Sequence, residues 1–202
     1  MNQHETDSIR KYDSISKNYD ETFEGKFTAK FKEKLLQLCT VSNGDRVLDV
    51  GCGNGSLIAA IASKENVQAY GVDLSPKMIE ECRKRYGHIP FEVSNGERLN
   101  FDDESLDFVT TCCVLHHLNA PQNFFKEAQR VLKQNGTLIV AEPWFPFGLR
   151  QFVDHVISPL LRAGDNKLFS HGRLKQLFVD NGFALTDIYK KGFIQVLKAK
   201  KT

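Results

Sequence analysis

The stretch that most constrains the fold is Val47-Leu48-Asp49-Val50-Gly51-Cys52-Gly53-Asn54-Gly55. Its apolar first half suits a strand at the centre of a parallel sheet, where side chains find no water on either face. The alternate glycines allow backbone conformations that other residues disfavour, and they let a ligand contact bare main chain. The helix expected next would present unpaired N–H groups and its positive dipole end at the same place. This order predicts a site for a small molecule that carries a nucleoside.

The apolar runs that follow predict alternating strands and helices. Strands are expected from about Arg46 and over Val67–Val72, Ile89–Val93, Leu106–Val114 and Thr137–Ala141. Helical patterns separate them, and one begins at Ser75-Pro76, where serine can cap the helix and proline fits its first turn. Strands and helices that alternate at this spacing predict a parallel α/β sheet.

The C-terminal segment departs from this alternation. Two β-like runs, Phe183–Tyr189 and Phe193–Ala199, are joined only by Lys190-Lys191-Gly192. So short a connection makes an antiparallel hairpin. The expected fold class is therefore α/β: a three-layer sandwich around a seven-stranded, mostly parallel sheet with an antiparallel C-terminal hairpin strand.

Two caps are expected on the sheet, within a single domain that spans residues 1–202. In the N-terminal helical cap, residues 1–44, small polar residues favour local turns over 1–25. A helix is expected from Lys26 onwards. The second cap is an insertion at 143–169, which opens with aromatic residues and continues as an apolar helical stripe that Pro159 should kink.

Composition excludes several classes of protein. Lysine and arginine exceed aspartate and glutamate by 27 to 25, and this net charge of +2 is too small to imply a nucleic-acid partner. Five cysteines without a C-x-x-C pair disfavour a disulfide framework or a zinc site, so no metal is expected and the cytoplasm is the expected compartment. The N-terminus lacks an apolar signal core, and no apolar run predicts membrane insertion. The pattern predicts no particular oligomeric state.

Two aspartates beside the glycine turn distinguish between nucleoside ligands. Dinucleotide-binding folds use G-x-G-x-x-G, whereas here the last glycine comes one position earlier and Asp49 precedes the turn. A carboxylate there would repel a diphosphate, whereas it would favour a ligand with an amine or a sulfonium group. Asp73, at the end of the second strand, is suited to accept hydrogen bonds from both ribose hydroxyls.

Four segments in chain order resemble the signatures of class I S-adenosylmethionine-dependent methyltransferases: residues 47–55, Gly71-Val72-Asp73-Leu74-Ser75, Leu106-Asp107-Phe108-Val109 and residues 130–138. The step Leu115-His116-His117-Leu118 is similar to the small-molecule branch that includes ubiquinone/menaquinone C-methyltransferases. The resemblance covers about residues 45–142. It implies a Rossmann-like fold, S-adenosylmethionine as cofactor and transfer of its methyl group.

The resemblance also implies a set of cofactor-binding residues. The turn Gly51-Cys52-Gly53 would approach the methionine part through its backbone, and Asp49 would hold the amine directly or through water. Asp73 would bind the ribose. The adenine would contact Leu74 and Met78, with Asn95 and Gly96 at its edge; the family often has aspartate where Asn95 stands. The last members of the set are Cys112, near the donor methyl, and Tyr12 and Tyr19, which would fold over the cofactor. Packing explains Met78, Cys112 and the two tyrosines equally well.

The sequence constrains the residues around the methyl acceptor less than those around the cofactor. A general base is needed only if the acceptor loses a proton, and the candidates near strand ends are His116, His117 and Glu142, with no choice among them. Aromatic residues of the insertion favour a small, partly apolar acceptor: Trp144, Phe145, Phe147 and Phe152. The Asn-Pro-Pro-Tyr signature of enzymes that methylate amide or adenine nitrogens is absent after the fourth strand.

Two other classes of function stay open. A non-catalytic protein that binds S-adenosylmethionine would share every feature above. A nicotinamide-dependent oxidoreductase would share the glycine turn, but the chain contains no Tyr-x-x-x-Lys pair.

Overall fold

The computed structural model describes residues 3–146, 148–149 and 168–202. Its strands are β1 (Arg46–Val50), β2 (Gln68–Asp73), β3 (Phe91–Val93), β4 (Leu106–Cys112), β5 (Leu132–Pro143), β6 (Phe183–Lys191) and β7 (Ile194–Lys201). Its α-helices are α1 (Gln3–Ile15), α2 (Phe23–Leu38), α3 (Ser56–Ala62), α4 (Pro76–Arg85), α5 (Pro121–Val131) and α8 (His171–Asp180). Two short 3-10 helices are η1 (Ser16–Glu21) and η2 (Leu115–His117).

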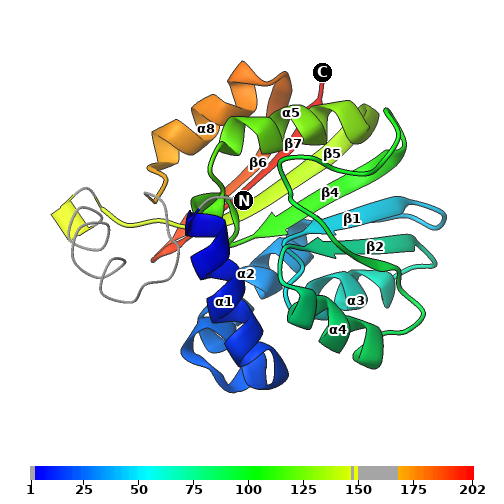
Figure 1. Ribbon diagram of the computed structural model, residues 1–202. Coiled ribbons are helices and arrows are strands. Elements are labelled where there is room, and N and C mark those ends of the chain that lie inside the picture. The colour runs from blue at the N-terminus through cyan, green and yellow to red at the C-terminus, as the bar shows by residue number, and fades with distance from the viewer. Residues whose placement is uncertain (1–2, 147, 150–167) are drawn as a thin grey trace.

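The strands form one seven-stranded sheet in the order β3-β2-β1-β4-β5-β7-β6. Neighbouring strands from β3 to β5 run parallel, whereas β7 is antiparallel to both β5 and β6. Helices cover both faces (Figure 1). The structure thus confirms the predicted fold class, a three-layer sandwich with a reversed C-terminal strand.

Each face of the sheet has its own apolar core, because side chains alternate along a strand. On one face Leu48 and Val50 pack with residues of α5 and α8, including Phe125 and Phe178. On the other face Val47 packs with residues of α2, α3 and α4. Burial on both faces explains why Val47, Leu48 and Val50 of β1 are all apolar.

The local turns predicted for residues 1–25 are wrong. The chain forms α1 over thirteen of these residues and then the 3-10 helix η1. Asp13 near the end of α1 accepts hydrogen bonds from the Ser75 hydroxyl at 2.6 Å and from the backbone N–H of Lys77 at 3.2 Å. Contacts with a segment some 60 residues away thus stabilise a helix that local sequence disfavours. The predicted helix from Lys26 is confirmed, but α2 begins at Phe23 because Thr22 caps it.

Two other segments differ from expectation. Strand β5 begins at Leu132, five residues before the predicted start at Thr137, and it includes Asn135, which has φ +64°. Strand β4 ends at Cys112, and Cys113 has φ +59°. In a continuous strand these two neighbouring side chains would point to opposite faces of the sheet. The turn at Cys113 makes the Cys112 and Cys113 thiols hydrogen-bonded neighbours. Most of the predicted 143–169 insertion, with its kink at Pro159 and with Phe147 and Phe152, lies outside the described residues.

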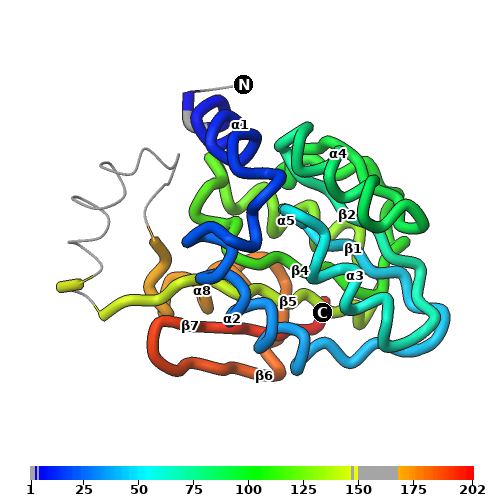
Figure 2. Tube along the Cα trace, turned by 90° about the horizontal axis from the view of Figure 1, so that it is seen from below, coloured from blue at the N-terminus to red at the C-terminus, as the bar shows by residue number. Residues whose placement is uncertain are grey.

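The parallel strands bring their carboxyl ends to one edge of the sheet, and the N-terminal helices lie at that edge. Figure 2 shows α1 beside α4, with the β6–β7 hairpin at the far side of the sheet. Among the described residues, no helix is both long and apolar enough to cross a membrane.

Candidate functional site

The glycine turn after β1 is held by backbone hydrogen bonds and by one carboxylate. Gly51, Gly53 and Gly55 have φ of +69°, +54° and +77°. The N–H groups of Gly51 and Cys52 donate to the Val72 carbonyl at 2.8 and 2.9 Å. These bonds tie the turn to the end of β2, so the predicted use of glycine for unusual backbone conformations is confirmed.

Asp73 connects the turn to the start of α4. Its Oδ2 accepts the Gly53 N–H at 2.8 Å, and its Oδ1 accepts the Ser75 N–H at 2.9 Å. Burial raises the pKa of this carboxyl group, against the lowering effect of those bonds. Ser75 in turn caps α4 by accepting the Met78 N–H at 3.1 Å. The Asp73 carboxylate is thereby oriented at the end of β2, where its outer lone pairs are available to a ligand.

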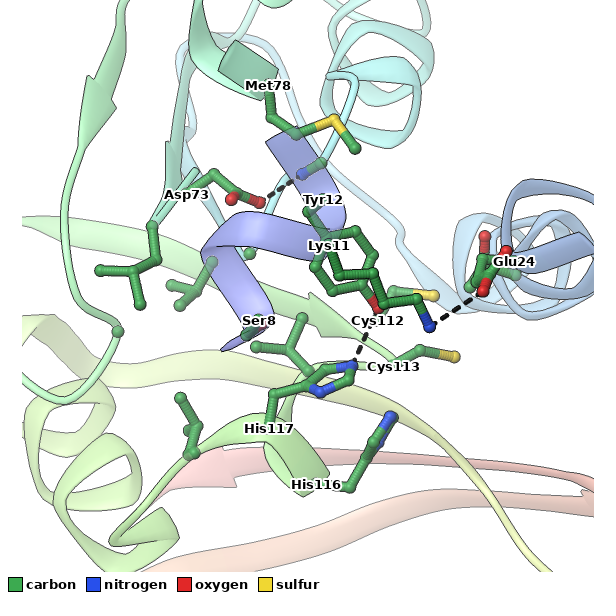
Figure 3. Close-up of a pocket in the computed structure, with 18 of the residues that line it drawn as sticks. Ser8, Lys11, Tyr12, Glu24, Asp73, Met78, Cys112, Cys113, His116 and His117 are labelled. Carbon is green, nitrogen blue, oxygen red and sulfur yellow. Dashed lines mark hydrogen bonds and ion pairs between the residues drawn. The ribbon is translucent and has the colours of Figure 1, made fainter. Parts of the chain in front are cut away.

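A cavity with a volume of about 340 Å³ opens between the strand ends and the N-terminal helices. Figure 3 shows Asp73 and Met78 on one side of it, His116 and His117 on the other, and Tyr12 between them. Predicted cofactor residues in its lining are Tyr12, Tyr19, Gly51, Gly53, Asp73, Leu74, Met78, Asn95, Gly96 and Cys112. Of the catalytic candidates, His116 and His117 line it.

Asp49 and Cys52 lie beneath the turn and outside the cavity lining. Asp49 is buried and accepts the Thr110 hydroxyl at 2.8 Å. Cys52 is buried, and a thiol–thiol hydrogen bond to Cys82 raises its pKa. The Cys82 thiol also donates to the Gly53 carbonyl at 3.0 Å. Asp49 and the Cys52–Cys82 pair therefore support the turn from behind.

Asp49 gives the protein a measurable pH dependence. Burial raises the pKa of its carboxyl group to about 7, with the Thr110 hydrogen bond opposing the shift. The unfolded value is about 3.9, so the native state binds more protons between these values and stability falls as pH rises through that window. From about pH 5 to pH 8 we expect wild type to lose on the order of 2 kcal/mol more than Asp49→Asn, as measured by urea denaturation. Parallel pH profiles for the two proteins would contradict this.

Helix α1 lies across the cavity, and the sequence predicted none of the hydrogen bonds and ion pairs that hold it there. Besides the Asp13 bonds to α4, the Glu5 carboxylate accepts the side-chain amides of Asn95 and Asn119, both at 3.0 Å. Lys11 forms an ion pair with Glu24 of α2 at 2.9 Å. These side chains look like ordinary solvent-facing polar residues in sequence, so only their tertiary partners mark them as part of a lid over the cavity.

Tyr19, the second tyrosine predicted to contact the cofactor, lines the cavity. Tyr19 is buried, burial raises its pKa, and its hydroxyl hydrogen-bonds to the Thr28 hydroxyl at 3.1 Å. Its main-chain carbonyl approaches α2 so closely that a side chain at Gly25 would collide with it. Phe23 and Phe27, one turn apart on α2, stack with 5.9 Å between ring centroids and line the mouth. The sequence predicted neither phenylalanine as a cavity residue.

The histidine pair is organised by a buried carboxylate. Glu142, at the end of β5, is fully buried. Its Oε1 accepts the N–H groups of Val114 and Leu115, both at 2.8 Å, and its Oε2 lies 2.7 Å from His116 Nδ1. His117 turns to the other side, with Nε2 3.0 Å from the Tyr12 hydroxyl. His171 lies outside the cavity lining and hydrogen-bonds to Gln195 at 3.1 Å, and His155 is outside the described residues.

Fold and cavity together define an α/β protein of the Rossmann-like type, with a site for a nucleoside at the carboxyl ends of its strands. Residues 48–140 match the family model for the methyltransferase domain. Residues 48–140 therefore form a methyltransferase domain of the class I S-adenosylmethionine-dependent type, as the sequence signatures indicated.

Relatives agree with this assignment. A demethylmenaquinone methyltransferase of Tropheryma whipplei is 32% identical over 155 residues, which cover 73% of this chain and 63% of the relative. The chain spans about half to two thirds of the length of the first curated relatives that it matches.

Solved structures share the fold at low identity. A methyltransferase in complex with the Haloferax volcanii Trm112 methyltransferase activator has a TM-score of 0.82 and 18% identity, covering 94% of this chain and 96% of that one. Geranyl diphosphate C-methyltransferase from Streptomyces coelicolor, in complex with S-adenosyl-L-homocysteine, has a TM-score of 0.74 and 16% identity, with coverages of 86% and 79%.

Proposed function

We propose that this protein transfers the methyl group of S-adenosylmethionine to a small, partly apolar acceptor. The observation that carries the proposal is the single cavity itself. It joins the oriented Asp73 carboxylate and the bare backbone of Gly53 to an aromatic side formed by Phe23, Phe27 and Phe145. A donor and an acceptor can therefore lie end to end in one enclosed space.

The donor end is suited to the cofactor residue by residue. A Cβ atom built on Gly53 would meet nothing within 4 Å, so the methionine part can approach the backbone there. Asp73 is positioned to accept both ribose hydroxyls, and Leu74 and Met78 offer apolar surface to the adenine. Asn95 already donates to Glu5 of the lid, so an adenine edge at Asn95 would also contact the lid helix.

The protein supplies alignment and exclusion of water. The cofactor, when bound, supplies a methyl group on a sulfonium that is reactive towards direct displacement. The lid helix α1 and the buried Tyr19 cover the junction between donor and acceptor ends, which favours an in-line arrangement and keeps water from competing. The names of two similar proteins, which specify menaquinone and geranyl diphosphate chemistry, support a small acceptor with a large apolar part.

Binding and turnover test the proposal separately. Isothermal titration calorimetry should show binding of S-adenosylmethionine, and release of S-adenosylhomocysteine should be measured across hydroxyl, amine, thiol and activated-carbon acceptors. Tighter binding of NADH than of S-adenosylmethionine would favour an oxidoreductase. Binding without turnover on any acceptor would favour the second candidate, a non-catalytic regulatory protein, because every cofactor contact above would serve it equally.

The pH dependence of binding tests the role of Asp49. If its carboxylate holds the cofactor's amine through water, affinity should fall as pH drops below about 7 and Asp49 becomes protonated. The fall should be absent in Asp49→Asn, which is uncharged at every pH. An affinity that is independent of pH in wild type would leave Asp49 with a role in the turn alone.

We also propose that the protein works in the cytoplasm and without nucleic acid. All five cysteines are free and buried, which suits a reducing compartment. The net charge of +2 provides little attraction for a polyanion.

A further inference from the structure

The three catalytic candidates have different surroundings, and these surroundings separate their roles. Glu142 is fully buried and is absent from the cavity lining. Its carboxylate accepts two backbone N–H groups on one oxygen and His116 Nδ1 on the other. Glu142 therefore touches no ligand in the cavity, but it fixes both the η2 backbone and the His116 ring.

The bond to Glu142 selects the tautomer of His116. An ionised carboxylate only accepts hydrogen bonds, so Nδ1 carries the proton and Nε2 carries the lone pair in the neutral ring. His116 is 8% exposed, and its imidazole lines the cavity. A buried carboxylate that orients a neutral imidazole towards a ligand site is an arrangement suited to proton abstraction.

His117 has a different partner. Its Nε2 lies 3.0 Å from the hydroxyl of Tyr12, and the two rings meet edge to face with centroids 5.5 Å apart. Tyr12 belongs to the lid helix, so this pair connects the lid to η2. The Nε2 of His117 is thus engaged by the lid, which suits His117 to holding the lid closed.

The acceptor end favours a flat aromatic molecule. Phe23, 75% exposed, and Phe27 stack with an interplanar angle of 15° at the mouth. Phe145, on the extension of β5, packs on Phe193 with centroids 5.0 Å apart and also lines the cavity. Such rings offer offset stacking to a planar apolar substrate.

We propose that the acceptor is an aromatic hydroxyl compound of the phenol class, with His116 as its general base and Glu142 as the residue that positions His116. This inference rests on the proposed methyltransferase function. As the phenolic oxygen attacks, the O–C bond forms and the S–C bond breaks, and its electron pair stays on sulfur. The phenolic proton moves to His116 Nε2, which leaves an aryl methyl ether, S-adenosylhomocysteine and an imidazolium that later releases the proton to water.

Charged and titratable neighbours bear on any pH profile of His116. Glu142 is hydrogen-bonded to it, the tilted ring of His117 packs on it with centroids 4.2 Å apart, and Cys113 lines the same cavity. Lys11 of α1 and Glu24 of α2 share the cavity as an ion pair. Because several groups titrate, a pH profile is informative only when variants are compared.

The acceptor class is tested with wild type. Phenol, naphthol, catechol and hydroquinone are offered with S-adenosylmethionine, alongside naphthyl methyl ether and naphthylamine as matched compounds without a hydroxyl. We expect S-adenosylhomocysteine release with at least one hydroxyl compound and none with the ether. If S-adenosylmethionine binds but no phenol is methylated, the inference is wrong while the cofactor assignment stands. If S-adenosylmethionine does not bind, the proposed function itself fails.

The roles are tested with Glu142→Gln and His116→Gln. Glutamine can keep its oxygen on the two backbone N–H groups, but its amide then donates to His116 and forces the proton onto Nε2. With the best neutral phenol, both variants should lose about 100- to 10,000-fold in kcat with unchanged S-adenosylmethionine affinity. His171→Gln is the control, because His171 is also hydrogen-bonded but lies outside the cavity.

A nitrophenol separates base catalysis from a structural role. Its hydroxyl is largely ionised at neutral pH and needs no base, so it should restore most of the lost rate in both variants. Their rates with the neutral phenol should also continue to rise with pH where the wild-type rate levels off. Equal losses with the ionised and neutral phenols would reduce Glu142 and His116 to structural residues and overturn the assignment.

Discussion

Replacement of Asp73 by alanine is expected to weaken S-adenosylmethionine binding by on the order of tenfold or more. The Asp73 carboxylate is already oriented by the N–H groups of Gly53 and Ser75, at 2.8 and 2.9 Å. In the proposed binding mode this carboxylate accepts both ribose hydroxyls, so alanine would remove two charge-assisted contacts at once. Isothermal titration calorimetry measures the change directly.

Two further variants make this result specific. Asp73→Asn keeps the shape of the side chain but loses the charge and one acceptor, so its affinity should lie between those of wild type and Asp73→Ala. Asp102→Ala, at an exposed aspartate in the turn before β4, should bind as wild type does. Unfolding by urea should be followed in parallel, because Asp73 also supports the turn. Wild-type affinity in Asp73→Ala would remove Asp73 from the site.

The second large effect is expected at Gly51. Its φ of +69° strains any other residue, and an added Cβ would lie 2.8 Å from Val114 Cγ1 and closer still to Cγ2. Val114 has little freedom to move, because its N–H is bonded to the buried Glu142. We expect Gly51→Ala to lower the free energy of unfolding by about 2–4 kcal/mol, from backbone strain and overpacking together.

Gly53 provides a matched comparison within the same turn. Its φ of +54° imposes a similar strain, but an added Cβ would meet nothing within 4 Å. Gly53→Ala should therefore cost only about 1–2 kcal/mol of stability. It should nevertheless weaken cofactor binding, because the methyl group would enter the space proposed for the methionine part. The prediction is wrong if Gly53→Ala destabilises the protein more than Gly51→Ala, or if it binds S-adenosylmethionine normally.

Local signals were sufficient for most of the fold. The apolar residues Val47, Leu48 and Val50 predicted β1 within a residue, because a strand buried on both faces favours apolar side chains. Ser75-Pro76 predicted the start of α4, and the short link after Tyr189 predicted the antiparallel hairpin. The donor half of the cavity followed from the same region, since glycine at positive φ and an aspartate at a strand end are local requirements.

The lid could not be predicted in this way. Glu5, Lys11 and Asp13 are polar residues of a segment with little apolar surface, so their sequence favours solvent exposure and turns. Their partners lie as far away as Asn119, 114 residues along the chain. No local pattern records a hydrogen bond that forms only after the sheet has brought its strand ends together.

The sequence by itself determined the strand, turn and aspartates that identify the methyl donor, because each depends on the conformation and chemistry of a few adjacent residues. Only the tertiary structure decided which partners His116, His117 and Glu142 have. The two histidines are neighbours in sequence with identical side chains, yet one bonds to a carboxylate from β5 and the other to a tyrosine from α1. The different surroundings on which the proposed roles rest are set by partners 26 and 105 residues away, which folding alone brings into contact with the pair.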